Sequence, residues 1–549
     1  MKPLIQSPLR RQVAEIVVVR ASGHASDQQR RYPQWELSNK ELQRLLRDGV
    51  GGVILLGGTS TELAHRCQTL RHWAKAPILL CADVEEGVGQ RFEGSTWLVP
   101  PIALGRLYQQ DQNRALSLAE RYGRCTGYQA HRCGLNWVLG PVCDVNNNPA
   151  NPVINVRAWG EDAETVSSLA CAFQRGLAKE GVLGCAKHFP GHGNTGVDSH
   201  LQLPVLEHNL HQLEELELMP FQAAIKTGID SVMTAHLLMR NLDASRPATL
   251  SRTVLQNLLR NQLKFEGLIV TDALVMQAIT QTYGAGEAAV MAFDAGADLL
   301  LMPEDADRAI EALCEALQSG QIPMQRLEAS RERRLKALRK VDDCNAEFLL
   351  NSSKSNNNPL ERDEDLALAK ELVSASLETL YPGPILATDS GINLLRVDGV
   401  LPCSMLTATA PALVLPSEAG FQSVIYHNLG ISPWRDDPEE PLVLQLLGSG
   451  PILLQLFLRG NPFRGDQDRH EPWAAAIKQL QRQKRLAALV VYGSPYLWDE
   501  LTQILDIGIP AVYSPGQMAE AQSQALACIL QPAKLPSNPQ PALIQEFTD

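Results

Sequence analysis

The chain has 549 residues and a mass of 60.2 kDa, with 45% hydrophobic and 20% charged residues. A protein of this length and composition typically folds into about two to four soluble domains, which excludes a largely disordered or fibrous chain. The formal net charge of −12 argues against non-specific binding to nucleic acid or anionic membranes, so we expect no nucleic-acid partner.

Neither membrane insertion nor secretion is expected. No apolar run approaches the roughly 18 residues of a membrane-spanning helix. Charges interrupt the N-terminal stretch MKPLIQSPLRRQVAEIVVVR, where a signal peptide needs an apolar core. The 11 cysteines are scattered and form no CxxC pair. This usage is typical of reduced cysteines, so we predict a cytoplasmic protein.

One polar segment divides the chain. Residues 351–365 read NSSKSNNNPLERDED, which is too poor in apolar residues to bury a core face and is typical of a linker. We predict a first domain over residues 1–345, a linker over 346–365 and a second domain over 366–549.

The first domain contains short apolar runs separated by amphipathic stretches. Stretches such as 39–49 and 161–181 carry apolar residues at helical spacing. Alternating buried strands and helices predict a parallel sheet, and eight such units in about 340 residues predict a TIM-type (β/α)8 barrel. A doubly wound open sheet is the alternative. The eight runs are EIVVVR (15–20), GGVILLG (51–57), APILLCAD (76–83), LNWVLGPV (135–142), VLGCAKHF (182–189), SVMTAH (231–236), GLIVTDAL (267–274) and ADLLLMP (297–303).

The second domain also alternates, which predicts a smaller α/β domain with an open, Rossmann-like sheet. Its strand-like runs are PILATD (384–389), ALVLP (412–416), LAALVVYG (486–493) and PAVYSP (510–515), and 471–486 is helix-like. Neither GxGxxG nor GxxxxGK[ST] occurs in it, so nothing indicates nucleotide binding.

Polar residues end five of the apolar runs in the first domain. Active sites of (β/α)8 barrels lie at the carboxyl ends of the strands, so polar residues in phase at these ends are candidates for chemistry. They are Asp83, Asp144, Lys187 with His188, His236 and Asp272.

The stretch 187–200, KHFPGHGNTGVDSH, holds three of the 12 histidines, and its proline and glycines predict a long loop after a strand. In this loop Asp198 and His200 lie two residues apart. An aspartate that accepts a hydrogen bond from an imidazole fixes the tautomer and leaves the other nitrogen as a positioned acid or base. The alternative is that both side chains cap turns of a surface loop.

A metal site is a further alternative for this loop. His188, His192, Asp198, His200 and His236 are of residue types that bind zinc. However, Phe-Pro-Gly separates the first two histidines, so they cannot lie one helical turn apart, and no HxH occurs. We predict no metal and no cofactor.

Motifs spread through residues 10–345 carry a family resemblance. KHFPGHGNTGVDSH closely resembles the KHFPGHGDTxxDSH loop of glycoside hydrolase family 3, in its β-N-acetylglucosaminidase branch. ADVEEGVGQRF (82–92) resembles that branch's DxEGGRVQRF, and 139–162 is similar to its APVxDVNxNPxNPVIxxRxFG. SVMTAH and the stretch 250–276 resemble its later strands, and residues 366–549 look like the companion domain of its two-domain members.

The resemblance implies a retaining glycosidase with Asp272 as nucleophile and His200 as acid/base, oriented by Asp198. The imidazolium would protonate the leaving oxygen while the carboxylate attacks, and the neutral ring would then activate the water that hydrolyses the ester. The resemblance also implies that sugar hydroxyls are bound by Asp83, Arg91, Arg157, Lys187 and His188. His236 either lines the pocket or braces the loop.

Three stretches depart from the family pattern. The family's EGG reads EEG at 85–87, and its following Arg is Val88, so local substrate contacts in this loop stay open. Asn194 stands in place of the Asp of GHGD, which leaves the proposed dyad intact. Ala273 follows Asp272 in place of a second acid, which removes a neighbouring charge but not the nucleophile.

We therefore expect an exo-acting β-N-acetylglucosaminidase whose partner is a GlcNAc-containing oligosaccharide or small molecule, with peptidoglycan fragments as the substrate class. Three alternatives stay open: a phosphorylase that uses phosphate as acceptor, a non-catalytic sugar-binding homologue, and a metal-dependent barrel hydrolase. The oligomeric state and the role of the second domain are not determined by the sequence.

Overall fold

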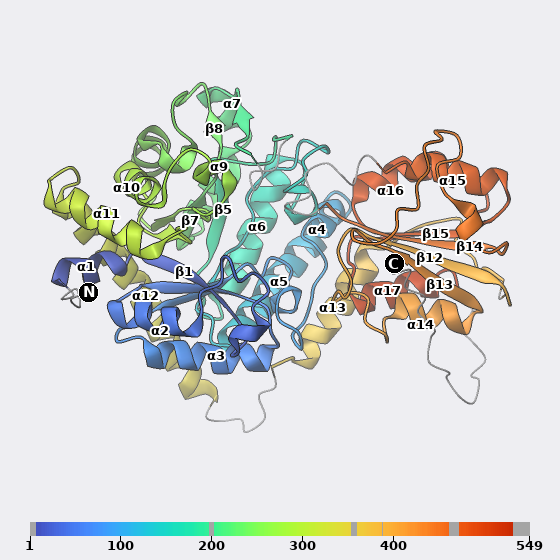
Figure 1. Ribbon diagram of the computed structural model, residues 1–549, viewed down its shortest axis with the longest axis horizontal. Coiled ribbons are helices and arrows are strands. Elements are labelled where there is room, and N and C mark those ends of the chain that lie inside the picture. Colours follow the sequence, from blue (N-terminus) through green and yellow to red (C-terminus); the bar gives the residue numbers. More distant parts are fainter. Residues whose placement is uncertain (1–6, 197–201, 353–359, 387, 461–470, 531–549) are drawn as a thin grey trace. The chain divides into compact units, whose positions relative to one another are not determined.

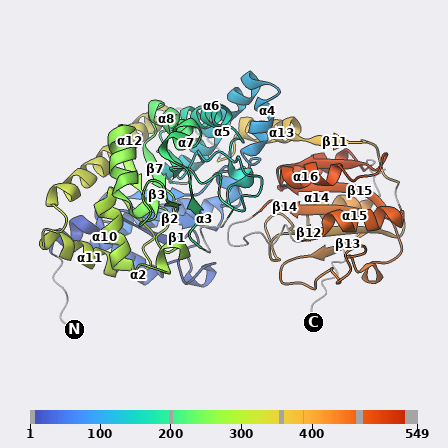
Figure 2. The ribbon, with the colours of Figure 1, turned by 90° about the horizontal axis from the view of Figure 1, so that it is seen from above.

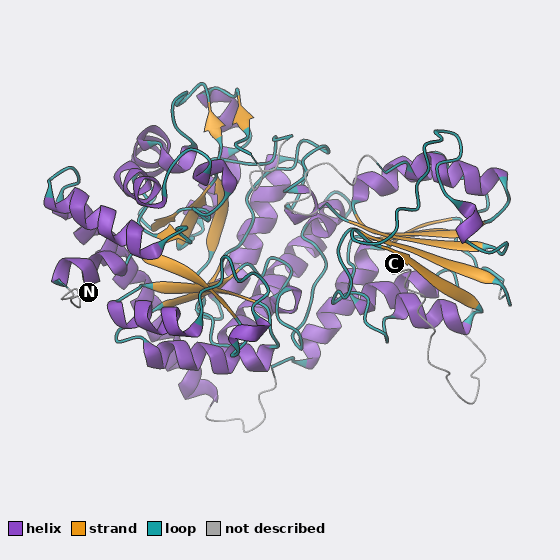
Figure 3. Cartoon of the chain, viewed as in Figure 1, coloured by secondary structure: helices purple, strands orange, loops and turns teal. Residues whose placement is uncertain are grey.

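The computed structural model of the chain describes residues 7–196, 202–352, 360–386, 388–460 and 471–530 (Figure 1). The chain divides into two compact units, residues 1–368 and 369–549, and each is described by itself. Helices and strands alternate in both units (Figure 3). Within the described ranges, none of the helices combines the length and the hydropathy that crossing a membrane requires.

The first unit is built on a closed ring of parallel strands. One arc has the order β10-β1-β2-β3-β4 and the other the order β5-β7-β9. Isolated parallel bridges join Trp137 to Leu183 between β4 and β5, and Val270 to Leu299 between β9 and β10, so the ring is complete. The strands are β1 (Val17–Ser22), β2 (Gly52–Leu56), β3 (Leu79–Ala82), β4 (Trp137–Val138), β5 (Cys185–Phe189), β7 (Ser231–Thr234), β9 (Leu268–Val270) and β10 (Leu300–Leu301). Each predicted apolar run overlaps one of them, which confirms the barrel.

Helices follow the strands and lie outside the ring (Figure 2). Their starts are encoded locally: Ser38 with Glu41 and Thr59 with Glu62 form capping boxes that satisfy the first backbone N–H groups of two helices. The outer helical segments are α2 (Asn39–Asp48), α3 (Ser60–Trp73), α5 (Gln112–Arg132), α6 (Ala163–Ala178), α8 (Leu218–Lys226), η5 (Thr253–Gln262), α10 (Ala285–Ala295) and α11 (Ala306–Gln318). The helices predicted over 39–49 and 161–181 are confirmed as α2 and α6.

Shorter elements complete the first unit. They are α1 (Pro8–Ala14), α4 (Ile102–Tyr108), α7 (Leu210–Glu215), α9 (Gln277–Thr280) and the parallel pair β6 (Val205–Leu206) and β8 (Leu238–Met239). The long helix α12 (Met324–Ser352) extends into the predicted linker, residues 346–365. Helix α13 (Asp363–Ser376) begins before the predicted end of this linker. Residues 353–359 lie outside the described part, and the exact domain boundaries stay a prediction.

The second unit is an open sheet in the order β11-β16-β15-β14-β12-β13, covered by helices on both faces (Figure 1). All neighbours are parallel except β11 with β16. The strands are β11 (Glu378–Leu380), β12 (Gly391–Val397), β13 (Phe421–Tyr426), β14 (Ile452–Leu458), β15 (Leu486–Gly493) and β16 (Ala511–Ser514). One core contains residues of α15 (Trp473–Arg482) and α16 (Pro495–Thr502), and the other those of α14 (Pro411–Glu418) and α17 (Ala519–Ala527). The predicted smaller α/β domain is confirmed.

Two strand predictions in this unit were wrong. ALVLP (412–416) is the middle of helix α14, because Pro411 starts that helix and a five-residue apolar run has no period that distinguishes strand from helix. In PILATD (384–389), Ile385 makes only an isolated bridge to Leu530, and Leu386 is 83% exposed, so the run lacks the burial of a central strand.

A buried aspartate holds the seam where the barrel closes. Asp298, just before β10, is fully buried. Burial alone raises the pKa of this carboxyl, but three arginine charges outweigh burial and hold the pKa below its ordinary value. Asp298 accepts hydrogen bonds from Arg260 Nη2 (2.7 Å), Arg326 Nη1 (3.1 Å), Arg333 Nη1 (3.1 Å), Ser330 Oγ (2.7 Å) and Ile269 N (3.0 Å).

Replacing Asp298 with Asn should lower the free energy of unfolding at pH 7 by about 3–5 kcal/mol, because it leaves three guanidinium groups without their shared carboxylate. Asp294→Asn, which removes a partly exposed carboxylate 3.9 Å from Arg252, should change it by less than about 0.5 kcal/mol. Urea unfolding measures both.

The folded-state pKa of Asp298 lies below the unfolded value of about 3.9. Its contribution to stability is therefore present above about pH 4 and is lost as the pH falls through the folded pKa. Equal stability of Asp298→Asn and the parent at pH 7 would contradict this role.

Candidate active site

The barrel brings the predicted site residues together at one end. Because its strands are parallel, their carboxyl ends meet at the same rim. Asp83 follows β3, Asp144 follows β4, Lys187 and His188 lie in β5, His236 follows β7 and Asp272 follows β9. The predicted acid/base dyad, Asp198 and His200, lies outside the described residues.

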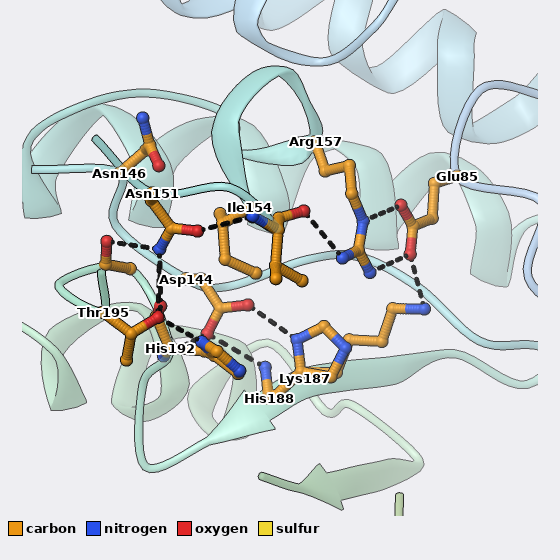
Figure 4. A network of polar contacts seen from close by, with 12 residues as sticks. Glu85, Asp144, Asn146, Asn151, Ile154, Arg157, Lys187, His188, His192 and Thr195 are labelled. Carbon is orange, nitrogen blue, oxygen red and sulfur yellow. Dashed lines mark hydrogen bonds and ion pairs between the residues drawn. The ribbon is translucent and has the colours of Figure 1, made fainter. Parts of the chain in front are cut away.

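Four charged side chains form a continuous cluster at this rim, and Figure 4 shows three of them, Glu85, Arg157 and Lys187. Lys187 Nζ lies 2.7 Å from Asp83 Oδ1 and 2.6 Å from Glu85 Oε1. Arg157 donates to both oxygens of Glu85, from Nε at 2.8 Å and Nη2 at 2.9 Å. The side chains of Lys187 and Glu85 are 1% and 4% exposed, whereas that of Asp83 is 38% exposed. Of the two carboxylates in the cluster, Asp83 is therefore the one turned toward solvent.

The electrostatics keep Glu85 and Lys187 charged. Burial alone raises the pKa of Glu85, but the charges of Arg157 and Lys187 outweigh burial and hold the pKa well below its ordinary value. Burial alone lowers the pKa of Lys187, but Asp83 and Glu85 outweigh it and raise the pKa above its ordinary value. The group can therefore present fixed donors and acceptors across the neutral range.

Replacing Glu85 with Gln should lower the free energy of unfolding by about 3–5 kcal/mol, because two buried cations lose their common carboxylate. Arg157→Met alone should also destabilise, and the double variant should lose at least 1 kcal/mol less than the two single losses added together, because the residues are in contact (~1 kcal/mol coupling). Urea unfolding measures the cycle, with exposed Glu93→Gln as the control. Additive losses would contradict a coupled cluster.

Asp144 anchors the loop that leaves β5 (Figure 4). Its Oδ1 accepts the backbone N–H groups of His188 (3.1 Å) and His192 (2.7 Å), and its Oδ2 accepts Nδ1–H of His188 at 2.7 Å. Burial alone raises the pKa of Asp144, but the neighbouring histidines outweigh it and lower the pKa. The carboxylate therefore fixes the His188 tautomer and leaves Nε2 as the nitrogen available to other partners.

Further contacts pin the same loop. Asn151 Nδ2 donates to the carbonyls of His192 (2.8 Å) and Gly193 (2.7 Å). His192 Nδ1 pairs with Thr195 Oγ1 at 2.8 Å. Burial lowers the pKa of His192 to about 4, so its ring is neutral at pH 7 and acts as a buried support.

Glycine is required where this loop passes close to the backbone. A Cβ at Gly193 would lie 1.6 Å from Val145 O, whereas a Cβ at Gly196 would meet nothing within 4 Å. At Gly191, where φ is +133°, a Cβ would lie 2.6 Å from Glu217 Cβ.

Gly193→Ala should therefore displace the loop and lower the free energy of unfolding by about 1–3 kcal/mol. The matched variant Gly196→Ala should leave it within about 0.5 kcal/mol of the parent. Amide hydrogen exchange over 188–196 should rise in the first variant alone. Equal exchange in both would show that the loop is not held at this contact.

Asp272 stands half-buried after β9. Its backbone N–H donates to Thr234 Oγ1 (3.4 Å), and its Oδ1 accepts Ala273 N at 2.7 Å. His236 is fully buried, with Nδ1 paired to Thr249 Oγ1 (2.9 Å) and Nε2 to Ala273 O (3.0 Å). These bonds favour the bracing role for His236, since it supports the turn that carries Asp272.

The remaining predicted ligands differ in exposure. Arg91 is exposed, and its Nε donates to the carbonyl of Asp83 at 3.1 Å. The third donor group of Arg157, Nη1, donates to Val153 O at 3.1 Å. Each of its three guanidinium nitrogens therefore bonds to another described residue. Arg157 therefore contacts Glu85 at the rim, and its predicted contact with sugar stays a prediction.

One central residue, Glu85, was missed in the sequence, and the partner of one predicted candidate, Asp144, was not foreseen. Glu85 lies in the EEG stretch that departs from the family pattern, and no local signal shows that it meets Lys187 from another strand. Asp144 was recognised as a strand-end residue, but its partnership with His188 depends on the neighbouring strand. Among the described side chains, no group of three or more His, Cys, Asp or Glu could hold a metal ion.

Family models match both units. The model described as Glycosyl hydrolase family 3 N terminal domain matches residues 9–337, and the model described as Bacterial Glycosyl hydrolase family 3 C-terminal domain matches residues 385–531. Beta-hexosaminidase A of Pseudoalteromonas piscicida is 31% identical over 362 residues, which cover 60% of this chain and 60% of that protein. A beta-hexosaminidase of Thiobacillus denitrificans is 35% identical over 285 residues, 51% of this chain and 79% of that protein.

Solved structures of similar proteins include members of the same family. The glycoside hydrolase family 3 β-N-acetylglucosaminidase from Paenibacillus sp. str. FPU-7 superposes with a TM-score of 0.74 at 28% identity, covering 95% of this chain and 96% of that one. NagZ from Neisseria gonorrhoeae, in complex with N-trifluoroacetyl-D-glucosamine, superposes with a TM-score of 0.51 at 28% identity and covers 66% of this chain and 98% of that one.

Proposed function

The chain belongs to glycosyl hydrolase family 3 and is a glycoside hydrolase, and on this premise we propose that it is a retaining exo-β-N-acetylglucosaminidase. The observation that carries the proposal is the charged cluster around Lys187 and Asp83 at the same barrel end as Asp272. The β-hexosaminidase relatives and the N-acylated glucosamine bound by the Neisseria enzyme support the substrate class. We propose peptidoglycan-derived or related glycosides as substrates and the cytoplasm as the location.

Asp83 and Lys187 form the centre of the proposed sugar site. A hydroxyl both donates and accepts, so a carboxylate beside an ammonium group can satisfy it completely. His188 offers Nε2 because Asp144 occupies Nδ1, and exposed Arg91 adds a mobile donor. The non-reducing sugar would lie against these groups with its anomeric carbon toward Asp272.

The proposed reaction has two steps. A carboxylate oxygen of Asp272 forms a bond to the anomeric carbon as the glycosidic C–O bond breaks, and imidazolium His200 gives its proton to the leaving oxygen. Neutral His200 then takes a proton from water, whose oxygen displaces the aspartate and releases the sugar with retained configuration. Asp198 holds the ring in position. A histidine with an ordinary pKa near 6.5 can serve as acid and base in turn.

Incubation with a 5-fluoro N-acetylglucosaminyl fluoride should trap the glycosyl ester, and mass mapping should place the label on the peptide that contains Asp272. Asp272→Asn should remain unlabelled and lose activity at least about 1000-fold, while Asp294→Asn should be labelled like the parent. Labelling at another residue, or full turnover by Asp272→Asn, would refute the assignment. Formation of the sugar 1-phosphate in added phosphate would show that phosphate, not water, is the acceptor.

A further inference from the structure

The connection between β1 and α2 places an arginine beside the proposed sugar site. Arg20 lies in β1, and Tyr32, Trp35 and Glu36 lie in the segment that follows. The segment leaves β1 at its carboxyl end, which is the end of the barrel that carries Asp83. None of these four residues belongs to the sites described above.

Strand register directs the Arg20 side chain into the barrel. Arg20 pairs with Ile54 of β2, and Ile54 pairs with Cys81 of β3, so the three side chains share one face of the sheet. Asp83, two residues beyond Cys81, points to the same face because side chains alternate along a strand. Lys187 of β5 reaches Asp83 over the intervening strand β4, which identifies that face as the interior.

The Arg20 guanidinium has aromatic and ionic neighbours among the described residues. Its Cζ lies 5.2 Å from the ring centroid of Tyr32 and 5.7 Å from that of Trp35. Its nearest carboxylate oxygen is Glu36 Oε1 at 3.8 Å, which is beyond hydrogen-bond distance. Within the described part of the chain, no N–H group of the Arg20 guanidinium makes a hydrogen bond, although the side chain is only 15% exposed.

The guanidinium of Arg20 interacts electrostatically with residues of the proposed sugar site. Burial lowers the pKa of Arg20, and the charges of Glu36 and Asp83 partly offset that effect. Arg91, which is bonded to the carbonyl of Asp83, acts in the opposite sense. Arg20 is therefore within electrostatic reach of both groups that the proposed function assigns to sugar binding.

We propose that Arg20 is a further substrate-binding residue, and that it donates to the same sugar hydroxyl that donates to Asp83. A hydroxyl donates one hydrogen bond and accepts others through its lone pairs. A carboxylate on one side and a guanidinium on the other therefore satisfy both its donor and its acceptor capacity. The rings of Tyr32 and Trp35 hold the guanidinium plane in place, which lowers the entropy lost on binding. The inference rests on the proposed function, since it needs a sugar at Asp83.

Calorimetric binding of N-acetylglucosamine and of its 3-, 4- and 6-deoxy analogues tests the inference. Arg20→Met should weaken binding of the parent sugar about 10- to 100-fold, as expected for loss of a hydrogen bond to a charged group. One deoxy sugar, the one without the shared hydroxyl, should bind equally to Arg20→Met and to the parent protein. Arg44→Met, which changes an exposed arginine of α2, should bind all four sugars as the parent does.

Arg20→Lys provides a second reading if Arg20→Met unfolds, because it retains the charge but not the planar fork. Arg20→Lys should weaken binding of N-acetylglucosamine by less than Arg20→Met does. Its loss of affinity should also disappear for the same single deoxy sugar. A loss of equal size for all four sugars, or no loss, would overturn the inference and leave Arg20 with a packing role.

The experiment also separates the inference from the proposed reaction. A parent protein that binds the sugars with this coupling but never turns over an aryl N-acetylglucosaminide would refute the proposed reaction and uphold the role of Arg20. A parent protein that binds none of the sugars would overturn the role of Arg20 together with the proposed sugar site.

Discussion

The contact between Lys187 Nζ and Glu85 Oε1, 2.6 Å apart and almost fully buried, is the interaction on which the carboxyl end of the barrel depends. An isolated charge in this environment would be strongly destabilising, so each member of the pair requires the other. Arg157 adds a second positive charge to Glu85, and Asp83 restores neutrality on the side of Lys187. The cluster thus contains two cations and two carboxylates. Its solvent-facing carboxylate, Asp83, is positioned by the buried ammonium group of Lys187.

Asp144 imposes a second constraint on the same region. One carboxylate satisfies two backbone N–H groups and one imidazole of the loop that leaves β5. The loop is therefore fixed at its start by a residue of the segment that follows β4. Close approach of Gly193 to Val145 O and the two bonds from Asn151 extend this fixation to residue 193. The described start of this loop is therefore held by both side-chain and backbone contacts.

The fold was largely predictable because its signals are local. Each barrel strand is buried on both faces, so each reads as a short apolar run, and capping residues mark where α2 and α3 begin. The same signal failed at ALVLP, which belongs to a helix whose Ala412 and Leu413 pack in the core with Phe421 and Leu526. Strands β12, β13 and β14 were not predicted individually.

The composition of the site was less predictable than its position. The sequence by itself determined which residues end the barrel strands, and the motif around 187–200 determined the family, because both are properties of consecutive residues. Which charges pair was decided by the tertiary structure: Glu85 meets Lys187, Asp144 meets His188, and Arg20 lies beneath two aromatic rings. These partners are 102, 44 and 12 to 15 positions apart in the chain, as their numbering gives, and strand register and ring closure bring them together. No local pattern encodes such contacts, because their energy depends on burial, which the folded barrel alone creates.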